Sequence, residues 1–253
     1  MKRIFLLTGF GVLLFLAFLF ARAPAGLLLV ALPELDEVHV HAPAGTVWNG
    51  RFRHVQAGPL RLESVEWSLR KAPLLMGRAD IDFRARINQG RVEGQVRAHP
   101  NGEVRIRQAI GQQIPLASLA PLFNQPPGMV SGDGAFEIRD ARIKGTEPVS
   151  ADAELRVFNL GVNMMGNHQL GNFAAQLQGS DGEFTLSFRD VGENAPFSVS
   201  GDAEFSLPQR RYSINGRIRA RDDAPENLAS MLPYLGQADE QGAHPLRLSG
   251  RIQ

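Results

Sequence analysis

The chain of 253 residues contains no cysteine, and its aromatic residues are nearly all phenylalanine, with only two tryptophans and two tyrosines. Without cysteine there are no disulfides, thiolate metal sites or cysteine nucleophiles. An excess of one charge is missing too, because 27 basic and 26 acidic residues leave a formal net charge of +1. This balance gives no electrostatic basis for binding nucleic acid. Hydrophobic residues make up 43% of the chain, which is enough for a folded domain.

Signatures of catalysis are also missing. The sequence contains no G-x-S-x-G elbow, P-loop, G-x-G-x-x-G or H-E-x-x-H motif. His39 and His41 share one face of a predicted strand, but no carboxylate-histidine pattern completes a metal site, so a solvated strand edge is the better interpretation. The alternating Asp80, Asp82, Arg84 and Arg86 are typical of a cross-strand charge ladder rather than a general acid-base pair. We therefore predict no catalytic, cofactor-binding or metal-binding residue and a protein that is not an enzyme.

The N-terminus carries the one long apolar run. Lys2 and Arg3 precede an uncharged stretch from Ile4 to Ala21, whose first seventeen residues span roughly 26 Å as a helix. A cleaved signal peptide is the alternative, since Ala21-Arg22-Ala23 offers an A-x-A site. The length of the run and Pro24, just after that site, favour a retained anchor.

The anchor sets the expected topology. Positive charges before the run place the N-terminus in the cytoplasm and all that follows the run outside the inner membrane. We expect residues 1–32 to comprise a cytoplasmic N-terminus, a single transmembrane signal-anchor helix and a membrane-proximal segment. Residues 33–253 are then a periplasmic β domain. The predicted location is the cell inner membrane, single-pass, with the bulk of the chain in the periplasm.

Beyond residue 45 the hydrophobic period is two, the mark of half-buried antiparallel strands. Residues 78–87 show it most clearly, with apolar side chains on one face and charges of both signs on the other. The alternation slips by one residue near Ser64, which predicts a β-bulge. Turn signals separate the apolar runs, at residues 88–90, 99–102, 180–182 and 207–209.

Two segments have helical spacing instead, around residues 116–123 and 228–235. Each follows a proline and contains another, Pro121 or Pro233, so each helix should be short or bent. Leu116-Ala117-Ser118 and Leu228-Ala229-Ser230 match, and these matches predict an internal duplication. The predicted fold is all-β: a long curved antiparallel sheet built from two similar repeats, about 45–140 and 150–253, with two short helices.

The most informative cluster is Gly45-Thr46-Val47-Trp48-Asn49-Gly50, followed by Val65-Glu66-Trp67-Ser68-Leu69 and Leu74-Leu75-Met76-Gly77. Asn-Gly favours a two-residue turn, so Trp48 is expected to end one strand and Arg51 to begin its partner. Trp48 should bury a large apolar surface in this hairpin. We interpret the motif residues as structural: Gly45, Trp48, Asn49, Gly50 and Trp67.

These segments, behind a short signal anchor, resemble protein N of the bacterial type II (general) secretion pathway. The resemblance covers essentially the whole chain, and its specific part is residues 45–77. One departure is that Arg70-Lys71-Ala72 intervene before Pro73, where the family has proline sooner. The resemblance implies a non-catalytic accessory subunit of the machinery that exports folded proteins across the outer membrane. Its implied partners are other type II secretion subunits of the envelope and the inner membrane.

A lipid or another hydrophobic ligand is the alternative partner, carried or bridged across the periplasm by a long curved sheet. The fate of the apolar strand face separates the two hypotheses, because a covered face is a core and an open one is a binding site. A sheet that does not close also leaves two edges that a partner strand can complete. The final run, Leu246 to Ile252, is the candidate edge strand.

Overall fold

The computed structural model describes residues 22–27, 38–123, 125–126, 128–145, 147–163, 166–192, 195–222 and 224–251. No helix within these ranges is long and apolar enough to span a membrane. The predicted anchor, Ile4 to Ala21, lies outside the described residues.

The described chain forms one antiparallel sheet of thirteen strands, and each strand is hydrogen-bonded to its neighbours in sequence. The first six strands are β1 (Val38–Gly45), β2 (Asn49–Ala57), β3 (Leu60–Arg70), β4 (Ala79–Ile87), β5 (Gly90–Ala98) and β6 (Glu103–Pro115). The remaining seven are β7 (Val130–Lys144), β8 (Glu147–Asn163), β9 (Asn167–Ser180), β10 (Glu183–Val191), β11 (Phe197–Ser206), β12 (Arg211–Ala220) and β13 (His244–Arg251). The predicted all-β class and antiparallel sheet are confirmed.

The turns lie where the sequence predicts them. Asn88 and Gln89 join β4 to β5, and Asn88 takes the positive φ of 53° that such a tight turn requires. Residues 99–102, 181–182 and 207–210 make three further connections.

The helical segments are short because each contains a proline. α4 (Leu116–Leu119) continues into a 3-10 turn, η1 (Ala120–Phe123), and α5 (Glu226–Ala229) is followed by η2 (Leu232–Leu235). Pro115 and Pro225 stand at the N-caps, and Gly236 with a φ of 136° ends η2. One helix was not predicted, α3 (Lys71–Leu74), and it occupies the point where the chain departs from the family pattern.

The order of elements recurs along the chain. Three strands, a short helix with a 3-10 turn and a return strand occur as β4-β5-β6-α4-η1-β7 and again as β10-β11-β12-α5-η2-β13. The duplication itself stays a prediction.

Bulges bend the sheet. The one predicted near Ser64 is present: two residues of β3 between Glu63 and Glu66 face a single residue of β4, and Ser64 has a φ of 52°. Gln113 in β6 and Asn159 in β8 lie at further bulges, with φ of 52° and 50°. Each bulge bends its strand and increases the local twist.

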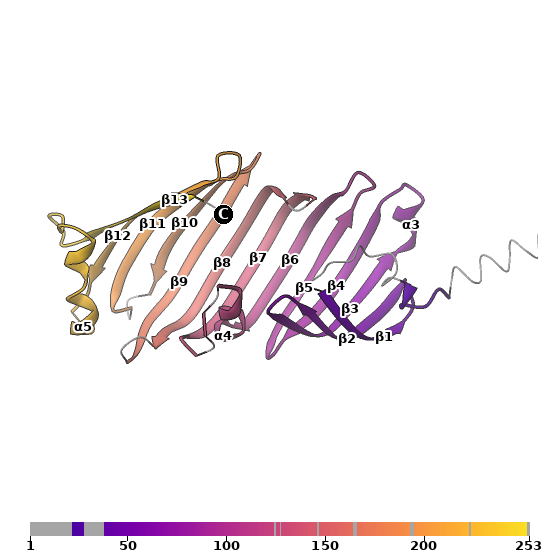
Figure 1. Cartoon of the computed structure of the whole chain (residues 1–253), viewed down its shortest axis with the longest axis horizontal. Coiled ribbons are helices and arrows are strands. Elements are labelled where there is room, and N and C mark those ends of the chain that lie inside the picture. The colour runs from indigo at the N-terminus through magenta and orange to yellow at the C-terminus, as the bar shows by residue number, and fades with distance from the viewer. Residues whose placement is uncertain are drawn as a thin grey trace, which may run out of the picture.

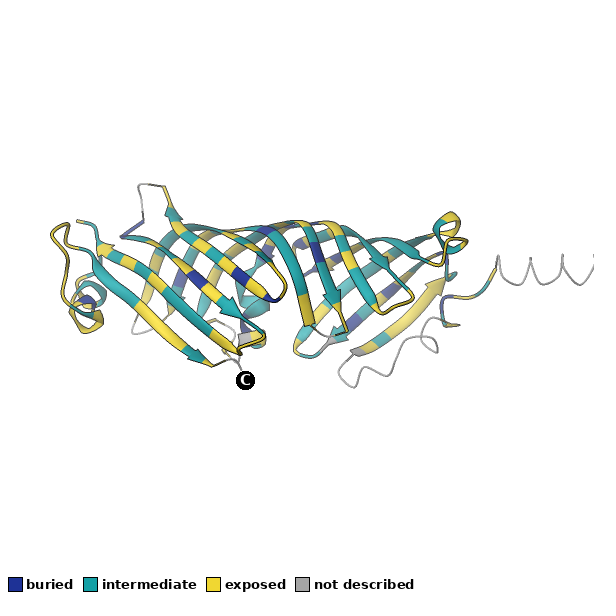
Figure 2. Ribbon diagram, turned by 90° about the horizontal axis from the view of Figure 1, so that it is seen from above, coloured by how far each residue is buried: buried dark blue, intermediate teal, exposed yellow. Residues whose placement is uncertain are grey.

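The bent sheet is an arch. Its middle strands form the crown, and the ends around β1 and β13 turn towards the side on which α4 lies (Figures 1 and 2). Buried residues are spread thinly along the strands rather than gathered in a central core (Figure 2).

Candidate functional site

The five motif residues meet at the β1–β2 connection. Gly45 ends β1 and Asn49 begins β2, which leaves residues 46–48 as the loop. The Thr46 backbone N–H donates to the Asn49 carbonyl oxygen at 2.9 Å, and the Asn49 N–H donates to Thr46 Oγ1 at 3.2 Å. The predicted two-residue turn at Asn49 and Gly50 is therefore wrong. Trp48 lies in the loop instead of ending a strand. The hydrogen bonds between Thr46 and Asn49 close the hairpin before Gly50, so Asn49 and Gly50 belong to β2 and not to the turn.

Trp48 and Trp67 hold this loop against β3. The side chain of Trp48 is 4% exposed, and its carbonyl oxygen accepts from the Leu69 N–H at 2.7 Å. The indole Nε1–H of Trp67 donates to the Val47 carbonyl oxygen at 3.0 Å. The Trp67 ring also packs on Phe52, with ring centroids 4.3 Å apart. Both tryptophans therefore hold the loop in place through backbone hydrogen bonds and packing.

The segment just before the β domain docks on the same loop. The Val47 N–H donates to the Ala23 carbonyl oxygen at 2.9 Å, and the Ala25 N–H donates to the Gly45 carbonyl oxygen at 3.1 Å. Ala25 is buried, and Pro24 forms an isolated β-bridge with Thr46. The motif loop thus receives the residues that directly follow the predicted anchor.

One face of the sheet carries continuous rows of apolar residues. Paired residues share a face, so each row can be followed from strand to strand. The longest row crosses all thirteen strands: Gly45, Gly50, Trp67, Phe83, Gly94, Ala109, Ile138, Ala153, Leu177, Leu186, Ala203, Ile214 and Leu248. A second row runs on one side of it, from Leu69 through Ile106 and Phe184 to Gly250. A third runs on the other side, from Ala85 through Phe136 to Leu246.

Aromatic rings on this face lie over glycines of the next strand. A methyl group added to Gly111 would lie 2.6 Å from Phe136 Cδ1, and one added to Gly201 would lie 2.9 Å from Phe188 Cζ. The same arrangement pairs Trp67 with Gly50, Phe184 with Gly179 and Tyr212 with Gly250. Sequence reasoning missed these pairs. Their signal is a glycine in the apolar phase of a strand, where a larger side chain is expected.

The apolar face is concave and largely open. It is the inner side of the arch, where α4 rests on β6 and β7 (Figure 1). Within the described ranges no second layer of strands lies over it, and Leu155 and Leu248 remain 39% and 56% exposed. This concave apolar face forms a trough. It is about 58 Å long, because twelve spacings of about 4.8 Å separate its thirteen strands.

The convex face is charged and bound together by arginine-carboxylate pairs between strands. Arg70 pairs with Asp82 at 2.9 Å, Arg105 with Asp140 at 2.6 Å, and Arg139 with Asp152 at 3.2 Å. The least exposed of these pairs joins Arg97 and Asp80, with side chains 18% and 14% exposed. Arg97 donates to both carboxylate oxygens, at 2.7 and 2.8 Å, and these bonds hold the pKa of Asp80 below its usual value. The predicted ladder around Asp80, Asp82 and Arg84 is thus confirmed.

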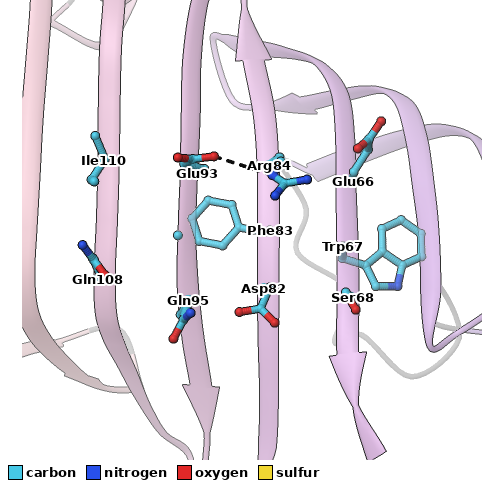
Figure 3. A pocket seen from close by; sticks show the side chains of 11 residues that line it. Glu66, Trp67, Ser68, Asp82, Phe83, Arg84, Glu93, Gln95, Gln108 and Ile110 are labelled. Atoms are coloured by element: carbon cyan, nitrogen blue, oxygen red, sulfur yellow. Dashed lines mark ion pairs between the residues drawn. The ribbon is translucent and has the colours of Figure 1, made fainter.

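A shallow depression crosses β3 to β6, with a volume of about 510 Å³ (Figure 3). Eight of its labelled residues project to the charged face: Glu66, Ser68, Asp82, Arg84, Glu93, Gln95, Gln108 and Ile110. Trp67 and Phe83 alternate with these and therefore project to the opposite face. Because Glu93 already pairs with Arg84, the depression offers scattered polar groups rather than a convergent constellation.

One polar pair interrupts the apolar face. Asp190 lies on the apolar face of β10, and its side chain is only 11% exposed. Its carboxylate accepts a hydrogen bond from Arg221 at 2.6 Å and another from the Val199 N–H at 2.8 Å. Arg221 also donates to the Ala195 carbonyl oxygen at 2.8 Å. The pair fixes the connection that carries the buried Ala195 and Phe197.

The two histidines of the predicted strand, His39 and His41, lie on the edge strand β1. His39 and His41 are exposed on β1, opposite Gln56 and His54. In the part of the chain that the structure describes, no group of three or more histidine, aspartate or glutamate side chains is arranged to hold a metal ion.

Comparison with known proteins agrees with the motif. The family model described as type II secretion system (T2SS), protein N matches residues 36–247. A relative from Aeromonas hydrophila named type II secretion system protein N is 26% identical over 261 residues, covering 100% of both chains. A protein of the same name from Pectobacterium carotovorum subsp. carotovorum is 26% identical over 253 residues, or 96% of each chain. A third, from Aeromonas salmonicida, is 44% identical over 43 residues, or 17% of this chain and 92% of that one. No solved structure matches the chain.

Proposed function

The chain belongs to the type II secretion system protein N family, and on that premise we propose that it is a non-catalytic subunit of the secretion machinery. It is anchored in the inner membrane by the Ile4 to Ala21 run, its β domain lies in the periplasm, and it contributes to the export of folded proteins across the outer membrane.

The family match supports the assignment to the secretion machinery, and the open apolar face is the observation that makes binding its activity. Soluble proteins rarely leave more than a few hundred Å² of contiguous apolar surface exposed, and larger patches mark interaction sites. One apolar row crosses all thirteen strands of this single-layer sheet, two more run from β3 and β4 to β13, and together they form such a surface. The charged face, by contrast, is held from β3 to β7 by ion pairs between neighbouring strands. The activity of the protein is therefore binding, and the concave face is its principal surface.

Charge placed in the trough tests the proposal. Leu155 projects from β8 into the trough and is exposed, so Leu155→Glu leaves the fold intact while spoiling apolar contact. Gln176→Glu is the matched control, because Gln176 is exposed on the charged face of the adjacent β9. In cells that lack the native protein, Leu155→Glu should reduce secreted protein in the medium, whereas Gln176→Glu should restore it fully. Equal secretion by both variants, at equal protein levels, would exclude the trough as the working surface.

A carrier or bridge for phospholipid acyl chains is the second candidate, favoured by the unbroken length of the apolar rows. It predicts that a photoactivatable phospholipid in membrane vesicles labels trough residues of β6 to β9. Labelling should fall in Leu155→Glu and persist in Gln176→Glu. If secretion depends on Leu155 while no lipid label reaches the trough, the occupant is a protein.

A further inference from the structure

Among the residues that the structure describes, β13 has a neighbouring strand on one side and a free edge on the other. β13 is hydrogen-bonded only to β12 within the described residues, and β12 pairs with it from Arg211 to Ile218. η2 lies at its first residues, where His244 Nδ1 is 2.8 Å from the Gly236 carbonyl oxygen. From Leu246 to Arg251 the edge is uncovered (Figure 1). All three apolar rows stop there, at Leu246, Leu248 and Gly250.

The opposite edge is protected. β1 contains Pro43, which has no N–H to donate, and Ala42 bends the strand with a φ of 52°. The docked segment around Pro24 covers the end of β1 at Thr46. β13 also contains a proline, Pro245, but it lies at the start of the strand beside η2, and from Leu246 to Arg251 the strand has neither proline nor positive φ. The two edges are therefore unequal, and β13 is the one suited to pairing.

The charges at this end of the sheet indicate what kind of strand could pair with β13. β12 and β13 contain five arginines and no carboxylate: Arg211, Arg217, Arg219, Arg247 and Arg251. Arg251 lies directly opposite Arg211, an unfavourable pairing of like charges. Among the described residues, the side chains of Arg247 and Arg251 make no hydrogen bond or ion pair.

Elsewhere in the sheet such arginines form ion pairs with carboxylates of the neighbouring strand. Arg105 of β6 meets Asp140 of β7, and Arg139 of β7 meets Asp152 and Glu154 of β8. A second copy of β13 in this position would add Arg247 and Arg251 to the same basic face, so self-pairing is disfavoured.

We propose that the free edge of β13 accepts an extended segment of another protein, which carries acidic residues on one face and apolar residues on the other. The segment would add a fourteenth strand: its carboxylates pair with Arg247 and Arg251, and its apolar side chains extend the trough beyond Leu246 and Leu248. This inference rests on the proposed function, since it describes how another subunit of the machinery joins the protein.

Two synthetic peptides test the chemistry on the full chain in detergent micelles. One alternates valine with glutamate, and the other alternates valine with lysine. The glutamate peptide should bind, bind less well as salt rises, and lose about tenfold or more in affinity when Arg247→Glu and Arg251→Glu are combined, since two cross-strand charge pairs change sign. The lysine peptide should then bind the double variant instead.

Arg189→Glu is the matched control. Arg189 is exposed on the same face of β10, an interior strand with no free edge, so this change should leave peptide binding unaltered. Arg189→Glu and the single Arg247→Glu variant change the net charge by the same two units, so equal loss from these two would mean that only overall charge matters and would overturn the proposal. Failure of the glutamate peptide to bind the native chain would overturn it too.

Position is tested through a single cysteine, because the natural chain contains none. Ser249→Cys places a thiol on the exposed face of β13, and Ser200→Cys places one on interior β11. With oxidised glutathione added as the oxidant, a glutamate peptide with one cysteine should form a disulfide with the first variant and not with the second. Secretion in cells separates the two proposals. If the double edge variant secretes normally, the edge assignment fails and the proposed function stands; if removal of the whole protein leaves secretion intact, the proposed function fails.

Discussion

Trp67 lies across Gly50 of the neighbouring strand, so closely that a methyl group on Gly50 would come within 2.7 Å of Trp67 Cη2. The bare glycine is what allows the indole to reach over β2, pack on Phe52 and donate to the Val47 carbonyl oxygen. The position of Trp67 therefore depends on the absence of a side chain at Gly50.

Gly50→Ala should disrupt this contact. The added methyl group would meet both the Trp67 ring and the Ala44 carbonyl oxygen, 2.9 Å away, and backbone cannot move aside cheaply. We expect a loss of about 1–3 kcal/mol in the free energy of unfolding, as overpacking usually costs. Urea titration followed by tryptophan fluorescence measures it, since both tryptophans are in this cluster. Gly26→Ala is the control, because nothing lies within 4 Å of a methyl group there; equal stability of the two variants would contradict the contact.

Trp48→Ala should destabilise the domain more severely. Removal of a buried indole typically costs about 3–5 kcal/mol, and Trp48 is among the least exposed side chains. The loss should appear as degradation of the β domain in cells, and Trp48→Phe should recover part of it by restoring apolar volume. A Trp48→Ala protein that is as stable as the native chain yet blocks secretion would instead make Trp48 a contact residue.

Asp80→Asn should change how stability depends on acid. The bonds from Arg97 lower the pKa of Asp80 in the folded protein, so the unfolded chain takes up the proton at higher pH. The pair therefore stabilises the fold above the ordinary carboxyl value of 3.8 and loses this effect as pH falls through the lower, folded pKa. Asp80→Asn should lower stability at neutral pH and flatten the decline below pH 3.8.

Asp82→Asn is the comparison for that experiment. Asp82 pairs with Arg70, but their side chains are 37% and 50% exposed, and such pairs contribute little. Chemical denaturation across the acid range should separate the two variants. Identical pH profiles would show that the Arg97–Asp80 pair is no stronger than an ordinary surface pair.

The anchor prediction concerns residues outside the described part of the chain. The mature protein should keep its N-terminus and resist alkaline extraction from inner membranes, because the Ile4 to Ala21 run is long enough to span. N-terminal sequencing settles the alternative: a mature chain that begins near Pro24 would mean a cleaved signal peptide. Such cleavage would also remove the Ala23 carbonyl oxygen that Val47 binds.

The sequence predicted the local features of this fold and much of its motif. The bulge at Ser64, the turn at Asn88 and the broken helices at Pro121 and Pro233 each depend on a few neighbouring residues. The predicted turn at Asn49 and Gly50 does not form, because hydrogen bonds between Thr46 and Asn49 outweigh the local preference of Asn-Gly.

By itself, then, the sequence determined that the chain forms amphipathic strands with a charged face and an apolar one, since period-two alternation is a property of each strand alone. Only the tertiary structure decided that β1 to β13 pair in order without closing, that the apolar face is the inner side of the arch, and that glycines such as Gly50 and Gly201 lie under aromatic rings. The physical reason is that curvature and register accumulate over many strands, so a bulge in β6 or β8 changes which residues face each other far along the chain.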